Sequence, residues 1–112
     1  MTYRVRFTEE AEADLVRLYE FILAKDSSDW SLATRDSSDW SLATRALEAI
    51  KNGIRGLEFS PFSYRKATSD NPFLRELIIP FGASGYVALF EIDNDQTVTI
   101  LAVRHQLEED YH

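Results

Sequence analysis

The stretch 73-FLRELIIPFGASGYVALFEIDNDQTVTILAVRHQLEEDY-111 decides the fold of this chain. It contains three runs rich in β-branched and aromatic residues, separated by short turn-forming clusters: 73–81, 86–92 and 97–105. This pattern predicts three antiparallel strands joined by hairpins. Pro80 has no N–H to donate to a ladder, so its end of the first run is expected at a sheet edge or a bulge.

The segment before this meander begins with a predicted strand and a predicted helix. Residues 3–7 alternate apolar and basic side chains, which is typical of a strand. Thr8 is a good N-cap, and acidic residues fill the following turn, where the helix dipole favours negative charge. An apolar stripe from Ala11 to Ile22 recurs at helical spacing, so we expect a helix at about 9–25.

A tandem duplication interrupts the chain next. Residues 26–35, DSSDWSLATR, are followed at once by an identical copy at 36–45. Two copies are too few and too short for a solenoid, so we interpret them as a duplication near the tip of a helical hairpin. The second copy is expected to supply the native helix start and the first an extra turn or linker. Trp30 would then be more exposed than Trp40.

The second helix leads from the duplication to the meander. An apolar stripe from Ala43 to Leu57 predicts this helix, and Pro61 stops it by about residue 58. A short strand at 62–66 and a loop at 68–72 follow. The predicted order is β-α-α-β-β-β-β in one domain, residues 1–112. This is an α+β fold, an antiparallel sheet with a helical hairpin packed on one face.

Composition limits the classes of function. The chain has 12 Lys and Arg against 19 Asp and Glu, a formal net charge of −7, which disfavours direct nucleic-acid binding. It has no cysteine, so disulfides and thiolate metal sites are excluded. Neither a signal peptide nor an uncharged run long enough for a membrane helix is present. We therefore expect a cytoplasmic protein with no cofactor, no metal and no membrane partner.

The candidate functional residues are mostly basic. The sequence has no phosphate-binding glycine loop, no HExxH and no nucleophile elbow. Five basic residues lie on or near strands whose ends can converge, which would place a small positive spot on an acidic protein; they are Arg65, Lys66, Arg75, Arg104 and His105. Such a spot could bind a phosphate while His105 or Tyr111 moves a proton. Alternatively, Arg75 pairs with a strand neighbour and Arg104 with Glu108 or the other tail acids.

Successive side chains of a strand point to alternate faces of the sheet, and this alternation concerns the two basic residues at the end of the last run, Arg104 and His105. Arg104 has the parity of Val98 and Ile100, whereas His105 has that of Val103. If the strand persists to its end, the two side chains are expected on opposite faces of the sheet.

Four segments together resemble the ParE/RelE toxin superfamily, and its ParE-like, plasmid-stabilisation branch in particular. They run in the family order over nearly the whole chain, apart from the ten extra residues. The segments are YRVRFTEEAEADL at 3–15, SPF at 60–62, LREL at 74–77 followed by GYVAL at 85–89, and VTILAVRH at 98–105 with its tail EEDY at 108–111.

The resemblance implies a toxin of a type II toxin–antitoxin pair, held inactive by a ParD-like antitoxin encoded nearby. ParE-like members are associated with poisoning DNA gyrase, whereas RelE-like members cut ribosome-bound mRNA. Arg75 matches the family's third-strand arginine, Arg104 and His105 match its basic C-terminal pair, and Tyr111 lies farther out than a catalytic tyrosine. Antitoxins of this superfamily commonly dock on the helical hairpin. The candidate antitoxin-binding residues are Leu15, Leu18, Tyr19, Ile22, Trp40 and Leu47.

The acidic composition favours a gyrase poison over an RNA-cutting enzyme within this superfamily. Arg75, Arg104 and His105 would then be binding or structural residues. The alternatives are a ribosome-dependent mRNA endonuclease of RelE type, in which these residues and Tyr111 would be catalytic, and a degenerate toxin fold that only binds its antitoxin.

Overall fold

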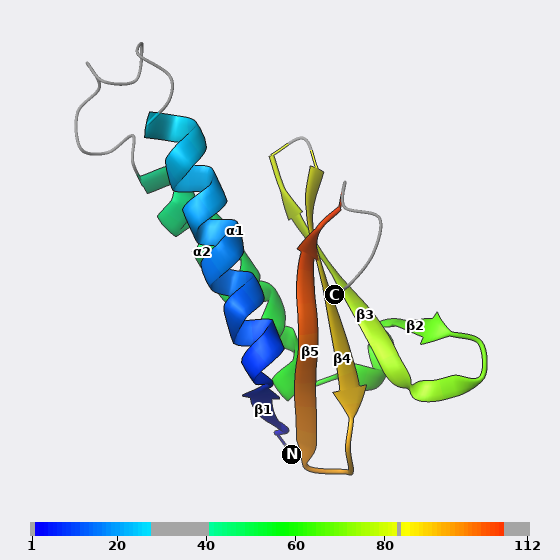
Figure 1. Ribbon diagram of the computed structural model, residues 1–112. Coiled ribbons are helices and arrows are strands. Elements are labelled where there is room, and N and C mark those ends of the chain that lie inside the picture. The colour runs from blue at the N-terminus through cyan, green and yellow to red at the C-terminus, as the bar shows by residue number, and fades with distance from the viewer. Residues whose placement is uncertain (1, 28–40, 83, 107–112) are drawn as a thin grey trace.

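Two helices cover one face of a five-stranded sheet in the computed structural model, which describes residues 2–27, 41–82 and 84–106 (Figure 1). This arrangement confirms the α+β class and the element order predicted from the sequence. The helices are α1 (Glu9–Ser27) and α2 (Ser41–Arg55). The short 3-10 turns η2 (Gly56–Glu58) and η3 (Pro61–Ser63) follow α2. The strands are β1 (Arg4–Phe7), β2 (Arg65–Thr68), β3 (Asn71–Phe81), β4 (Ser84–Ile92) and β5 (Thr97–His105).

The sheet is antiparallel except at one edge. Its strand order is β1-β5-β4-β3-β2, and β2 to β5 pair antiparallel with their neighbours. In contrast, β1 pairs parallel with β5, with Arg4 opposite Thr97 and Phe7 opposite Ile100. The sequence predicted the strand but not its direction. Hairpin turns determine the direction of consecutive strands, whereas both helices and three strands separate β1 from β5.

Local capping sets the start of α1 as the sequence indicated. The Thr8 hydroxyl oxygen accepts the Ala11 N–H at 3.1 Å, and three acidic residues occupy the first turn. The helix runs two residues past its predicted end at 25. The predictions about the first repeat copy, Trp30 and Trp40 lie outside the described residues.

The core lies between the helical layer and the near face of the sheet. Phe90 and Leu57 are its largest fully buried side chains. Each buried aliphatic or aromatic side chain of this kind contributes on the order of 2 kcal/mol to folding. The other large members of the buried cluster are Leu18, Ile50, Ile54, Leu77, Ile79, Tyr86, Ile92, Val98, Ile100 and Val103.

A bulge in β5 reverses the parity of its last residues. Leu89 lies opposite Ala102 but Phe90 lies opposite Ile100, so the residue between, Leu101, is extra. As a result Val103 joins the core with Ile100, whereas Ala102 does not belong to the core cluster. The sequence predicted, for an unbroken strand, that Arg104 lies on the same face of the sheet as Val98 and Ile100. The bulge makes this prediction wrong.

The connection into β3 differs in detail from the sequence prediction. Residues 61–63 form η3 because proline favours the first helical position, and β2 consequently starts at Arg65 rather than at residue 62. The predicted loop at 68–72 is a two-residue turn at 69–70. Pro80 pairs with Gly85 beyond the reach of β2, which confirms its expected place at a sheet edge. Over the described ranges, no helix is both long and apolar enough to cross a membrane.

Candidate functional site

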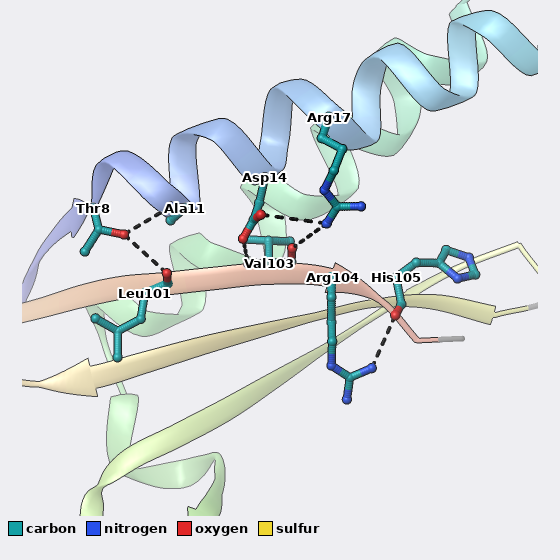
Figure 2. Close-up of polar contacts among 8 residues, drawn as sticks. All are labelled: Thr8, Ala11, Asp14, Arg17, Leu101, Val103, Arg104 and His105. Atoms are coloured by element: carbon teal, nitrogen blue, oxygen red, sulfur yellow. Dashed lines mark hydrogen bonds and ion pairs between the residues drawn. The ribbon is translucent and has the colours of Figure 1, made fainter. Parts of the chain in front are cut away.

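Side chains of α1 cover the edge of β5 where β1 has ended (Figure 2). The Thr8 hydroxyl donates to the Leu101 carbonyl at 3.2 Å. The Asp14 carboxylate accepts the Val103 N–H at 2.9 Å, and the Arg17 guanidinium donates to the Val103 carbonyl at 3.5 Å. The N-cap residue Thr8 and two side chains of α1 thus satisfy backbone groups that the bulge and the end of β1 leave without a strand partner.

Asp14 is the one buried charged residue of this contact. Its exposed fraction is 6%, and its other oxygen lies 3.7 Å from Arg17. Burying a carboxylate is tolerated only when hydrogen bonds or a counter-charge compensate for lost water, and both are present here. Sequence reasoning missed this pair. The available signal was that Asp14 falls on the apolar stripe, three residues after Ala11 and four before Leu18.

Arg104 and His105 project from opposite faces at the end of β5, as expected, although the bulge exchanges their faces (Figure 2). His105 lies opposite Tyr86 on the helix side, with the two rings edge to face at 5.5 Å. Burial raises the pKa of the Tyr86 hydroxyl above its ordinary value of 10.0. Arg104 lies on the other face, opposite Val87.

Arg75 holds the segment before β2 against β3. Its Nε donates to the Pro72 carbonyl at 2.7 Å, and its Nη1 donates to the carbonyls of Phe62 at 3.1 Å and Tyr64 at 2.8 Å. The guanidinium also lies 5.3 Å from the centre of the Phe62 ring. Three carbonyl acceptors and one aromatic face make this arginine a structural anchor.

The basic candidates do not converge on one spot. Arg75 lies opposite Phe90 and His105 opposite Tyr86, four residues apart on β4, which separates them by about 13 Å along the strand. Arg104 lies on the other face of the sheet. The prediction that these basic side chains form one positive spot is therefore wrong. Tyr111 lies outside the described residues. Within the same ranges, no group of three His, Cys, Asp or Glu could hold a metal ion.

A shallow apolar groove lies between α1, α2 and β4, and its volume of about 10 Å³ is room for about one water molecule. Five of the six residues expected to bind an antitoxin line it, namely Leu15, Leu18, Tyr19, Ile22 and Leu47. Leu18 also belongs to the core, whereas the other four are half-buried and offer apolar surface to a partner. The sixth residue, Trp40, is outside the described part of the chain. Ala43, Ala46, Ile50 and Tyr86 complete the lining.

Two solved structures share this arrangement of a helical hairpin on one face of a five-stranded sheet. The chromosomal ParDE system from P. aeruginosa has a TM-score of 0.65 at 17% identity, covering 93% of this chain and 96% of that one. The RelBE2 complex from Mycobacterium tuberculosis has a TM-score of 0.53 at 24% identity, covering 95% and 100%.

The chain belongs to the family described as the ParE toxin of the type II toxin–antitoxin system parDE, whose model matches residues 5–110. No curated protein sequence matches it. This membership confirms the predicted superfamily and the predicted role as a toxin component.

Proposed function

We propose that this protein arrests growth by binding DNA gyrase in the cytoplasm, without itself catalysing a reaction. In this proposal a ParD-like antitoxin holds it inactive. Membership of the ParE family supports the toxin role. The scattered placement of its basic residues supports a binding mode of action over a catalytic one, and this is the observation that carries the proposal.

The argument against RNA cleavage is geometric. A general acid or base must lie within about 3 Å of the proton it transfers, and the donors that stabilise a phosphate must meet at that same phosphate. Arg75 and Arg104 lie on opposite faces of the sheet, and Arg75 already donates to three carbonyls. One phosphate cannot contact both guanidinium groups without unfolding the sheet.

The charge of the chain supports the same view. A formal charge of −7 repels a phosphate backbone, and a nuclease active site on such a protein would need a concentrated basic patch. Two of the basic residues on the sheet are instead neutralised locally. Arg65 pairs with Glu76 at 3.0 Å, and Arg6 lies 3.7 Å from Asp93. A protein target such as gyrase requires no such patch.

The groove between α1 and α2 is the proposed antitoxin site. Its walls are aliphatic and aromatic, and an amphipathic segment could insert apolar side chains at helical spacing. Tyr19 and Leu47 are half-buried on opposite helices and would contact such a segment from both sides. The partner would bind a surface that remains open after the core is complete.

Growth arrest in cells distinguishes the two modes of action. Expression of the native chain or of the His105→Gln variant would be induced in cells. Thymidine incorporation would then report DNA synthesis, and methionine incorporation would report protein synthesis in the same cultures. A gyrase poison predicts that DNA synthesis falls first and that His105→Gln remains toxic. An immediate fall in protein synthesis, abolished by His105→Gln in a folded protein, would contradict the proposal.

A further inference from the structure

Two phenylalanine side chains are exposed where the sheet reaches away from the helices. Phe62 in η3 is 47% exposed, and Phe73 near the start of β3 is 49% exposed. Their rings pack edge to face with centres 6.1 Å apart. In Figure 1, β2 and this end of β3 extend away from α1 and α2, which leaves the two rings uncovered. Contiguous exposed apolar side chains of this kind are typical of protein-binding surfaces.

Two basic side chains border the rings. Lys66 in β2 lies opposite Arg75 in β3, and Arg75 lies opposite the core residue Phe90, so both cations are on the helix side of the sheet. Phe73 is two residues before Arg75 in the same strand and shares this face. Lys66 is exposed and forms no ion pair with any residue that the structure describes. We call Phe62, Lys66, Phe73 and Arg75 the aromatic–basic patch.

The charge around this patch has the opposite sign to that of the rest of the chain. Of the 12 Lys and Arg and the 19 Asp and Glu, the segment 55–76 holds four and three, a net charge of +1. The rest of the chain holds eight and 16, a net charge of −8. One of the three acids, Glu76, pairs with Arg65 at 3.0 Å on the other face of the sheet. An acidic partner is therefore attracted to this end of the molecule and repelled elsewhere.

Arg75 holds the patch in one conformation. Its guanidinium lies 5.3 Å from the centre of the Phe62 ring and donates to the carbonyls of Phe62, Tyr64 and Pro72. The Tyr64 ring in turn packs edge to face on Phe90, with centres 6.0 Å apart. The chain that carries Phe62 is thus tied to the sheet on both sides. A surface ordered before binding loses little conformational entropy when a partner docks.

We propose that the aromatic–basic patch is the surface by which this toxin contacts its target protein. The target would present an aliphatic or aromatic side chain to the two rings and carboxylates to Lys66. Aromatic residues and arginine are enriched in protein interfaces. A nucleic-acid backbone requires several cations on one face, whereas the patch has two on an acidic chain. The inference rests on the proposed function, because it names the surface that a non-catalytic toxin uses.

The patch lies apart from the antitoxin groove. Tyr86 of the groove pairs with Ile79, which is six residues from Phe73 in β3, or about 20 Å along the strand. A partner confined to the groove leaves the patch uncovered. The two surfaces can therefore be altered separately.

Four single substitutions in the full-length chain test the inference. Phe73→Ser removes one ring, and Lys66→Glu reverses one charge. Val16→Ser and Lys51→Glu are the matched controls, because Val16 and Lys51 are exposed on α1 and α2, outside the patch. Melting followed by circular dichroism identifies the folded variants. If Phe73→Ser proves unfolded, Lys66→Glu still decides, because the Lys66 side chain is exposed and without an ion pair among the described residues.

Growth arrest and gyrase binding are the two measurements. Each variant is expressed in cells to measure growth, and the purified protein is titrated into DNA gyrase in a calorimeter. Phe73→Ser and Lys66→Glu should each raise the Kd for gyrase about tenfold or more and weaken growth arrest. Val16→Ser and Lys51→Glu should change the Kd by less than about twofold and leave growth arrest intact.

The outcomes separate the inference from the proposed function. A folded patch variant that binds gyrase and arrests growth like its control would overturn the inference and leave the proposed function standing. If the native chain arrests growth but binds no gyrase, the proposed function fails. Growth arrest then decides the inference: loss in the patch variants alone supports it, and retained arrest overturns it. A native chain that neither arrests growth nor binds gyrase would overturn both.

A fluorescent single-stranded oligonucleotide tests the other class of partner. Exposed aromatic rings beside cations also suit stacked bases. We expect no binding of the oligonucleotide to the native chain at micromolar concentrations. Binding that Lys66→Glu abolishes and Lys51→Glu preserves would mean that the patch receives nucleic acid, and would overturn the inference.

Discussion

Replacing Asp14 tests how strongly the fold depends on the contact between α1 and β5. The carboxylate accepts the Val103 N–H at 2.9 Å and is only 6% exposed. The strand β1 ends opposite Ile100, so it cannot supply another acceptor at Val103. Asp14→Ala therefore leaves a buried N–H group without its partner.

The expected cost follows from this geometry. A hydrogen bond to a charged group contributes about 1.5–3 kcal/mol, and removing one partner adds the desolvation cost of the other. The ion pair between Asp14 and Arg17 contributes less than about 1 kcal/mol to stability, because Arg17 is half exposed and lies 3.7 Å from the carboxylate. We expect Asp14→Ala to lower the free energy of unfolding by about 3 kcal/mol. Asp14→Asn keeps an acceptor oxygen and should cost about 1 kcal/mol.

Urea unfolding followed by circular dichroism measures both free energies. At about 4 °C per kcal/mol for a chain of this size, Asp14→Ala should also lower the melting temperature by about 12 °C. Glu20→Ala on the exposed side of α1 is the control and should change the free energy by less than about 0.5 kcal/mol. The reasoning fails if Asp14→Ala is as mild as this control, or if Asp14→Asn costs more than Asp14→Ala.

Three further predictions concern the hairpin, the core and the groove. Gly85→Ala should lower the free energy of unfolding by about 3 kcal/mol or more, since Gly85 has φ of +140° and an added Cβ would overlap the Ile79 carbonyl oxygen. An unchanged melting temperature would refute this prediction. Because burial raises the folded-state pKa of Tyr86, stability present below pH 10.0 should be lost as pH rises through the folded pKa. Tyr86→Phe should flatten that loss in alkaline melting curves. Leu47→Glu should weaken antitoxin affinity about tenfold or more in calorimetry, while Val16→Glu, outside the groove, should not.

Local signals in the sequence were sufficient for most of the fold. The N-cap at Thr8 and the apolar stripes predicted both helices, because capping and helical periodicity involve residues within a few positions of one another. Turn-forming clusters likewise predicted the β3-β4-β5 meander. The parallel pairing of β1 was not predictable, because it depends on contacts between residues more than 90 positions apart.

The candidate site was harder to predict because strand parity is easily broken. One extra residue at Leu101 exchanged the faces of Arg104 and His105. Arg75 was expected to contact phosphate or a strand neighbour, but it donates to the carbonyls of Phe62 in η3, of Tyr64 just after it and of Pro72 in its own strand. The groove was more accessible to sequence reasoning, since its residues share one stripe on each helix.

The most direct test of the proposed function is purified DNA gyrase incubated with supercoiled plasmid and increasing amounts of this protein. If it is a gyrase poison, linear plasmid trapped by the enzyme accumulates with protein concentration, and His105→Gln behaves like the native chain. Full supercoiling without cleaved plasmid at excess protein would contradict the account.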